Sequence, residues 1–217
     1  MVKQSTQFTV PPSWFSDWYE PAEFFGEVLA ILEPIASDRL FMDPEYQDLF
    51  DAFAAGRFAV ARLTDEVCLL RMERDRFPDF ALKFGDRIER FEFTEANRAG
   101  RRRGEEYQRR AERRRRGLPN EPDLFNPAEN IAAAREAIPR VIEAKAKKHY
   151  RPKPNLLVLV TLLGFEWPPD REAELIELTR PWRRGFESLW LLWGAHVFRA
   201  WPTPMKLTVP PAGHGRL

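Results

Sequence analysis

Apolar and other residues alternate along both arms of residues 77–96, and this pattern predicts a β-hairpin. Gly85-Asp86 supplies the turn between the arms. The alternating apolar positions are Phe80, Leu82, Phe84, Phe91 and Phe93. Because successive side chains of a strand point to opposite faces, we expect Glu92 and Thr94 to share one face of the second arm, while its phenylalanines point to the other.

Apolar residues at three- and four-residue spacing predict a helix that begins at Pro21 and ends before Pro34. Asp43-Pro44 is an N-cap followed by a first-turn proline, so a second helix is expected to begin there and to end near Gly56. Residues 57–63 fit either a helix or a strand.

Two further helices are predicted in the second half of the chain. Asn126-Pro127 and Glu129 supply the N-cap, the first-turn proline and the glutamate of a capping box for a helix that contains Pro139. The negative end of its dipole is matched by basic residues, namely Lys145, Lys147, Lys148 and His149. Asp170 is expected to cap the other helix, which Pro181 disturbs.

Runs of β-branched and apolar residues predict strands over residues 67–72, 155–163, 188–193 and 196–201. The run 155–163 is apolar on both faces, which is typical of a central, covered strand. Helices interspersed with such strands predict an α/β fold, a mixed central sheet flanked by helices. We expect a single domain over residues 1–217, with residues 202–217 as a weakly held tail.

Composition favours a heavily charged surface, because 31% of the 217 residues are charged and 44% are apolar. No apolar stretch is long enough to span a membrane, so we expect no membrane partner. The single cysteine, Cys68, cannot form an internal disulfide and lies in an apolar run, which favours a cytoplasmic protein. The sequence contains no P-loop, no GxSxG, no HExxH and no dinucleotide glycine motif, and this excludes several enzyme classes.

Residues 97–126 differ from the rest of the chain and predict a basic arm and a linker. Between positions 101 and 116, nine arginines face three glutamates, an excess of six positive charges. The arginines are Arg101, Arg102, Arg103, Arg109, Arg110, Arg113, Arg114, Arg115 and Arg116. Such an arm binds phosphates well, so nucleic acid is the expected partner. The alternatives are a solvated helix with Glu105–Arg109 and Glu106–Arg110 pairs, or contact with an acidic protein.

Two acidic residues on adjacent arms of the hairpin form the candidate site. Asp79 opens the first arm and Glu92 lies on the second, so their carboxylates can converge and bind a divalent cation such as Mg²⁺. The alternative is that Asp79 caps a turn and Glu92 lies on a solvated strand face. Glu95 is a third candidate metal ligand if a bulge turns it inward, and further candidates to complete the site are Glu45, Asp48 and Glu73.

Pro78-Asp79 at the start of one strand, followed by Glu92-Phe93-Thr94 on the next and then by a helix, a central strand and a helix, resembles the PD-(D/E)xK nuclease superfamily. The resemblance spans Val67 to about Trp201 and implies a restriction-endonuclease-like fold. It also implies Mg²⁺ held by the aspartate and the glutamate. Thr94 stands where that family has a lysine that helps to activate water, and Lys145 or Lys148 from the neighbouring helix is the expected substitute.

The expected function is that of a metal-dependent nuclease-like protein with Asp79, Glu92, Lys145 and Lys148 as its catalytic residues. Because Thr94 cannot supply a positive charge, a nucleic-acid-binding module without catalysis on the same fold is the first alternative. A protein–protein adaptor, suggested by the aromatic residues before Pro21, is the second.

Overall fold

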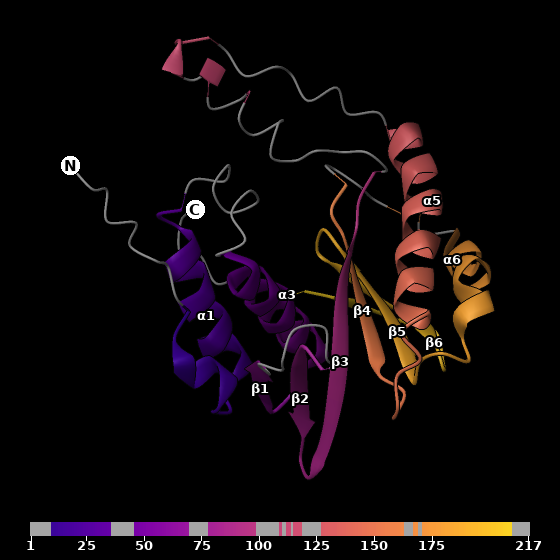
Figure 1. The fold of residues 1–217 in the computed structure, drawn as a ribbon, viewed down its shortest axis with the longest axis horizontal. Helices are drawn as coiled ribbons and strands as arrows, with labels where there is room; N and C mark the ends of the chain where they lie inside the picture. Colours follow the sequence, from indigo (N-terminus) through magenta and orange to yellow (C-terminus); the bar gives the residue numbers. More distant parts are fainter. Residues whose placement is uncertain are drawn as a thin grey trace.

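The structure is a computed structural model that describes residues 10–35, 46–69, 78–98, 109, 112–113, 115–118, 127–162, 167–168 and 171–209. A seven-stranded sheet forms its centre, and helices lie on both faces of that sheet (Figure 1). The predicted α/β fold with a mixed central sheet is confirmed at this level of detail.

The strands follow one another across the sheet in chain order, with β1 at one edge and β7 at the other. They are β1 (Glu66–Leu69), β2 (Phe80–Phe84), β3 (Arg87–Ala96), β4 (Asn155–Val160), β5 (Ser188–Trp193), β6 (His196–Trp201) and β7 (Met205–Thr208). β3, β4 and β5 run parallel, and the pairs on either side of them are antiparallel. The apolar strand β4 is therefore the middle of the sheet, as predicted.

Helices α1 (Pro21–Leu32) and α3 (Gln47–Arg62) cover one face of the sheet, and α5 (Pro127–Ala146) and α6 (Glu172–Thr179) cover the other (Figure 1). α5 connects β3 to β4, and α6 lies between β4 and β5. Crossovers between parallel strands are right-handed, and these two step across the sheet in the same direction. Both helices therefore lie on the same face.

Each face of the sheet has its own apolar core. On the α1 and α3 side, the single turn of 3₁₀ helix η1 (Pro12–Phe15) buries Trp14 beside Phe24, and Phe58 packs edge-on against Phe91 and Trp190. On the other side, α5 and α6 pack on the apolar residues of β4, β5 and β6. A strand has two faces, so the sheet separates residues of β3 that belong to different cores.

The predicted hairpin is confirmed. β2 and β3 pair antiparallel through Gly85, whose φ is +56°, and Phe80 lies opposite Phe91 with their rings stacked at 5.0 Å. Phe91 and Phe93 belong to the α1 and α3 core, whereas Ala96 belongs to the α5 and α6 core. Glu92 and Thr94 therefore face α5.

Helix α3 corrects one predicted boundary. It continues past Gly56 to Arg62 and ends where Leu63 takes a φ of +50°, so residues 57–62 are helical. Gly56 lies instead where α1 approaches α3, because a Cβ there would be 3.0 Å from Cδ1 of Phe24. The glycine permits close helix packing and does not end the helix. The predicted start at Asp43-Pro44 lies outside the described residues.

The end of the chain corrects a second expectation. Met205–Thr208 form β7, which pairs antiparallel with β6, so this part of the predicted tail is an edge strand of the sheet. Its exposed, alternating residues lack the apolar run that marked the inner strands, which is why the sequence pattern did not reveal it. Residues 210–217 lie outside the described part of the chain.

Prolines account for two other local features. Pro139 lies inside α5, which continues through it. Pro181 ends α6 at Thr179 and begins the short 3₁₀ helix η4 (Arg180–Trp182). The predicted caps Asn126 and Asp170 lie outside the described residues, as do residues 70–72 of the strand that begins with β1. Among the described residues, no helix is long and apolar enough to cross a membrane.

Candidate functional site

Asp79 and Glu92 lie side by side at the start of β2 and in β3. The backbone N–H of Asp79 donates to the carbonyl of Phe91 at 2.9 Å, and its Oδ2 accepts from the N–H of Phe93 at 2.6 Å. The register that pairs Phe80 with Phe91 places the preceding residue, Asp79, opposite Glu92. The two carboxylates are therefore neighbours, close enough for the charge of Glu92 to act on Asp79, and Asp79 bonds across the strands instead of capping its own turn.

Glu92 is a buried carboxylate, only 3% exposed, so the alternative of a solvated strand face is wrong. Its Oε1 accepts hydrogen bonds from Nζ of Lys145 and from the hydroxyl of Tyr150, the latter at 2.6 Å. Nζ of Lys148 lies 4.0 Å from the same oxygen. The end of α5, which carries Lys145, and the turn after it, which carries Lys148, thus bring both predicted lysines to the acidic pair.

The second oxygen of Glu92 has a different environment. Oε2 is buried and accepts no hydrogen bond from any described residue. A buried carboxylate oxygen without a donor costs free energy, on the order of 1–3 kcal/mol, unless a cation or another donor reaches it. Oε2 is therefore the atom of this site best suited to bind a ligand.

Burial and neighbouring charge raise the pKa of two aspartates here. The pKa of Asp79 is raised to about 6, chiefly by burial and then by the charge of Glu92, although the Phe93 N–H and the two lysines act in the opposite direction. The pKa of Asp51, on α3, is raised to about 7 by burial, by Asp79 and by Asp48, against the effect of its hydrogen bond from Gln47. These carboxyls exchange protons close to neutral pH, which is typical of functional sites.

Thr94 and Glu95 take different positions. Thr94 follows Glu92 on the same face of β3, where it adds a hydroxyl and no charge. β3 pairs with β4 in unbroken register from Phe91 to Ala96, so no bulge turns Glu95 inward. Glu95 points to the opposite face and accepts a hydrogen bond from Thr161. The structure therefore does not bring Glu95 to the acidic pair.

The donor set suits a hard cation that keeps much of its water. Within the described ranges, no group of three or more histidine, cysteine, aspartate or glutamate side chains is arranged to hold a metal. Mg²⁺, however, is commonly bound by one or two carboxylates together with waters and substrate phosphates. Asp79 and the unpaired Oε2 of Glu92 fit that pattern. Of the other candidates, Asp48 raises the pKa of Asp51, and Glu45 and Glu73 lie outside the described residues.

Most of the arginine arm lies outside the described residues, including Arg101, Arg102, Arg103, Arg110 and Arg114. Glu112 contacts two of the described arginines, Arg116 at 2.8 Å and Arg115 at 3.7 Å, both of them exposed. Arg109 is exposed and helical. Such exposed pairs contribute only a few tenths of a kcal/mol, so they are too weak to prevent Arg115 and Arg116 from contacting a polyanion.

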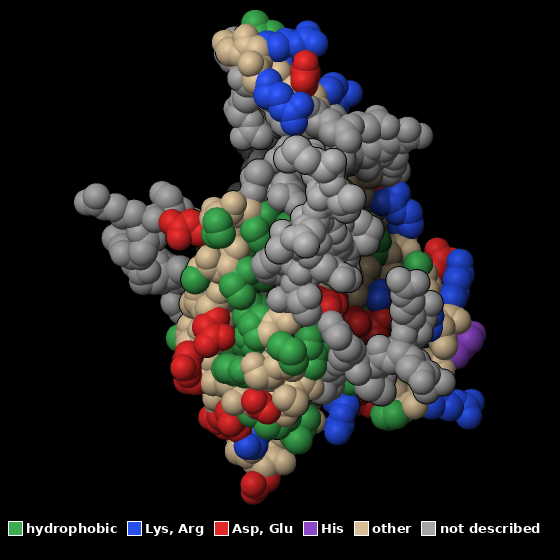
Figure 2. Space-filling model, turned by 60° about the vertical axis from the view of Figure 1, so that its left-hand side comes forward, with side chains coloured by type: hydrophobic (Ala, Val, Ile, Leu, Met, Phe, Trp, Pro, Cys, Tyr) green, Lys and Arg blue, Asp and Glu red, His purple; other side chains and the backbone are tan. Residues whose placement is uncertain are grey.

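Acidic and basic side chains are unevenly distributed over the surface. Residues 10–35 contain no lysine or arginine and carry five acidic residues, Asp17, Glu20, Glu23, Glu27 and Glu33. Acidic side chains predominate in the left and lower part of the face shown in Figure 2, whereas basic ones lie mainly at the top and right. A polyanion is repelled by the α1 side and is expected to approach from elsewhere.

Two residues of the site were missed by the sequence analysis. Asp51 lies three residues after Asp48, so both share one side of α3, and this spacing was the available signal. Tyr150 follows the last turn of α5, and nothing in the sequence near it indicates that its hydroxyl reaches Glu92. Its contact depends on how the chain turns between α5 and β4.

Comparisons with known proteins add no relative. No protein-family model, no curated protein and no solved structure matches this chain. Function is therefore inferred from the geometry and charge of the site.

Proposed function

We propose that this protein is a metal-dependent phosphodiesterase that acts on nucleic acid, with Asp79 and Glu92 as its acidic pair. The observation that carries the proposal is that these two carboxylates and the Lys145 ammonium lie together. The Glu92 carboxylate is buried, and its Oε2 has no hydrogen-bond donor among the described residues. Structural ion pairs do not need an unpaired carboxylate oxygen, whereas a cation-binding site does.

Asp79 and Oε2 of Glu92 would hold the cation. When bound, Mg²⁺ neutralises charge on the phosphate and lowers the pKa of a bound water. The N–H of Phe93 fixes the orientation of the Asp79 carboxylate, and the Tyr150 hydroxyl fixes that of Glu92. Such second contacts keep a ligand oriented before the cation arrives.

Lys145 is proposed to supply the positive charge that helps to activate water, which in the nuclease superfamily comes from a lysine at the position of Thr94. It reaches Glu92 from α5, so a positive charge enters the site from the helix and not from the strand. Its ammonium is placed to orient a water or to contact a phosphate oxygen beside Glu92. Lys148 adds a second positive charge on the same side.

The restriction-endonuclease-like fold is part of this proposal. The order of elements that the resemblance implies is a strand opened by Pro78-Asp79, the Glu92 strand, a helix, a central strand and a helix. β2, β3, α5, β4 and α6 follow one another in that order. This agreement supports the proposal without a matching relative.

Binding of nucleic acid without cleavage is the second candidate function. The contact between Lys145 and Glu92 favours it, because an ammonium that already neutralises Oε1 weakens the attraction of the pair for a divalent cation. In that case the site would hold a phosphate through Lys145 and Lys148, and the carboxylates would only position the two lysines.

A cleavage assay separates these functions. The purified protein is incubated with plasmid, single-stranded DNA and RNA in Mg²⁺ or Mn²⁺, with EDTA as the metal-free control. We expect metal-dependent cleavage of at least one substrate, reduced at least 100-fold by Asp79→Asn combined with Glu92→Gln. Cleavage that survives this double substitution contradicts the proposal, and binding without any cleavage favours the second candidate.

Matched substitutions on α5 sharpen this assay. Glu143→Gln removes an exposed carboxylate that pairs with Lys147 on the solvent side of the helix, so it should leave cleavage unchanged. Lys147→Met should likewise have no effect, whereas Lys145→Met should reduce cleavage strongly. Equal effects of the two lysine substitutions would show that charge on the helix, and not contact with Glu92, matters.

A further inference from the structure

A groove lies at the end of β3 that is nearest the hairpin turn. It is open to solvent and has a volume of about 270 Å³. Its lining residues are Arg87, Ile88, Glu89, Arg90, Pro152, Lys153, Asn155 and Glu187. Its two walls come from β3 and from the chain between α5 and β4. The sequence pattern predicted β3 as a hairpin arm but gave no sign of the second wall.

Both walls of this groove lead to the acidic pair. On β3, Ile88, Arg90 and Glu92 alternate with residues of the opposite face, so their side chains share the face that α5 covers. On the other wall, Tyr150 contacts Glu92 and Lys153, three positions later, lines the groove. The groove is therefore a continuation of the candidate site along one strand.

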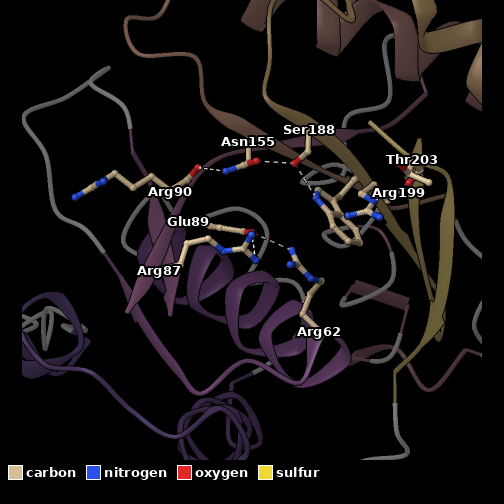
Figure 3. Close-up of polar contacts among 9 residues, drawn as sticks. Arg62, Arg87, Glu89, Arg90, Asn155, Ser188, Arg199 and Thr203 are labelled. Carbon is tan, nitrogen blue, oxygen red and sulfur yellow. Dashed lines mark hydrogen bonds and ion pairs between the residues drawn. The ribbon is translucent and has the colours of Figure 1, made fainter. Parts of the chain in front are cut away.

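Arg90 and Lys153 are exposed, and neither forms an ion pair with a described residue. Figure 3 shows the Arg90 side chain extending away from Asn155 and Glu89. Glu89, by contrast, is already neutralised, because it pairs with Arg87 at 2.8 Å and with Arg62 at 3.1 Å. The uncompensated charge of the groove is thus positive, with only Glu187 opposing it.

The floor of the groove is held in place by a chain of hydrogen bonds. Nε1 of Trp190 donates to Oγ of Ser188 at 2.9 Å, and that hydroxyl donates to Oδ1 of Asn155 at 2.6 Å. Nδ2 of Asn155 then donates to the carbonyl of Arg90 at 3.0 Å (Figure 3). The backbone that carries Arg90 is fixed to β4 and β5, so its position beside Glu92 is preorganised.

The spacing along β3 matches a polynucleotide strand. Two residues of a strand span about 7 Å, so Arg90 lies about one extended nucleotide from Glu92. Ile88 and Pro152 add apolar surface on which a sugar or base can rest. A groove of about 270 Å³ is small enough to hold part of one strand at a time.

We propose that this groove binds the backbone of a single-stranded nucleic acid, with Arg90 and Lys153 contacting the phosphate next to the one at Asp79 and Glu92. The proposal rests on the proposed function, since it assigns the neighbouring phosphate of the same substrate. It also names the substrate class as a single strand and gives the direction in which that strand leaves the site.

Fluorescence anisotropy of a labelled oligothymidylate in EDTA tests this assignment, because no cleavage occurs without metal. We expect Arg90→Ala combined with Lys153→Ala to weaken binding at least tenfold and to reduce the slope of log K against log salt by about 0.7, the effect of no longer neutralising one phosphate. Arg183→Ala combined with Arg184→Ala removes the same charge from exposed residues outside the groove and should change the affinity less than twofold. All four side chains are exposed, so melting temperatures should match the wild type.

The outcomes distinguish this proposal from the proposed function. If the Arg90 and Lys153 variant keeps the affinity and salt slope of the wild type, the groove does not bind nucleic acid, even if cleavage depends on Asp79 and Glu92. Loss of binding in that variant alone supports the groove, even if no substrate is cleaved. A duplex of the same length should bind at least tenfold more weakly than the single strand, and equal binding overturns the single-strand assignment.

Discussion

Lys145 and Glu92 meet between α5 and β3, and only one oxygen of the carboxylate is involved. Nζ of Lys145 and the Tyr150 hydroxyl both reach Oε1, while Oε2 accepts nothing from the described residues. The next lysine in the chain, Lys147, follows the last residue of α5 and pairs with Glu143 at the exposed surface. Two lysines two positions apart therefore occupy different environments, and they make a matched pair for experiment.

Lys145→Met should destabilise the fold. It removes the ammonium from a buried carboxylate but keeps a side chain of similar length, so the loss arises mainly from the uncompensated charge. We expect the free energy of unfolding to fall by about 2–3 kcal/mol. This is less than the cost of a buried charge that has lost every partner, because Tyr150 and Lys148 remain near Glu92. Urea denaturation at neutral pH measures it.

Lys147→Met is the control for this effect and should change the free energy of unfolding by less than about 0.5 kcal/mol, since its ion pair is exposed. If both substitutions cost the same, the contact between Lys145 and Glu92 contributes nothing specific.

Asp79 should make stability depend on pH in a defined direction. Its pKa is raised in the folded protein to about 6, above that of the unfolded chain, so the folded state holds this proton more tightly. The stabilisation of the folded state by this bound proton is fully present below about pH 4 and is lost as the pH rises through 6. The Asn side chain of Asp79→Asn cannot ionise, so at pH 8 this variant should be more stable than the wild type by about 3 kcal/mol, and the gain should be small at pH 4.

Asp51→Asn provides the companion measurement. Its pKa of about 7 in the folded protein extends the same effect to higher pH, so its gain should continue to grow between pH 6 and 8. The charge of Asp79 raises the pKa of Asp51, so replacing Asp79 already relieves part of the cost of ionising its neighbour. The double variant should therefore gain less stability than the sum of the gains of the two single variants. Denaturation curves that do not depend on pH, or fully additive gains, would show that Asp51 and Asp79 do not interact.

Two helical glycines should respond to alanine with opposite signs. Gly26 is exposed on α1 and a Cβ there meets nothing within 4 Å, so Gly26→Ala should stabilise the protein by about 0.5–1 kcal/mol. Gly56→Ala places a methyl 3.0 Å from the ring of the fully buried Phe24 and should destabilise it by about 1–2 kcal/mol. Thermal denaturation of both variants is the measurement, and a gain at Gly56 would mean that α1 can move away from α3.

Much of the fold could be predicted because local pattern and tertiary structure agree. The hairpin and the β5–β6 pair combine apolar strands with glycine turns, and β4 is a continuous apolar run. These strands form where expected, except that β4 ends at Val160 and not at residue 163. Gly56 was misread because a glycine that ends a helix and one that admits a neighbouring helix look the same in sequence. β7 was missed because an exposed edge strand needs no apolar pattern.

The candidate site was predictable only in part. Asp79 and Glu92 could be paired because the hairpin fixes their register. Lys145 and Lys148 could be added because the pattern placed them at the end of the next helix, although α5 itself ends at Ala146. Asp51 and Tyr150 come from segments whose distance from the hairpin is set by packing alone. The groove beside Arg90 depends likewise on the chain between α5 and β4, which has no periodic pattern.

The arginine arm should govern the salt dependence of binding to any nucleic acid. Replacing Arg101, Arg102, Arg103, Arg113, Arg114, Arg115 and Arg116 with alanine removes seven of its nine arginines. We expect the slope of log K against log salt to fall by several units for single and double strands alike, because phosphate contacts release counterions without regard to sequence. Titrations at several salt concentrations measure it, and an unchanged slope would show that the arm does not contact phosphate.

Binding of Mn²⁺, followed by electron paramagnetic resonance, tests most directly whether Asp79 and Glu92 form a cation site. The account predicts one bound ion per wild-type chain, weaker binding below about pH 6 as a proton competes for Asp79, and loss of binding on Asp79→Asn combined with Glu92→Gln. Glu143→Gln should bind like the wild type. Mn²⁺ binding that persists in the double variant, or its absence from the wild type, would contradict the account.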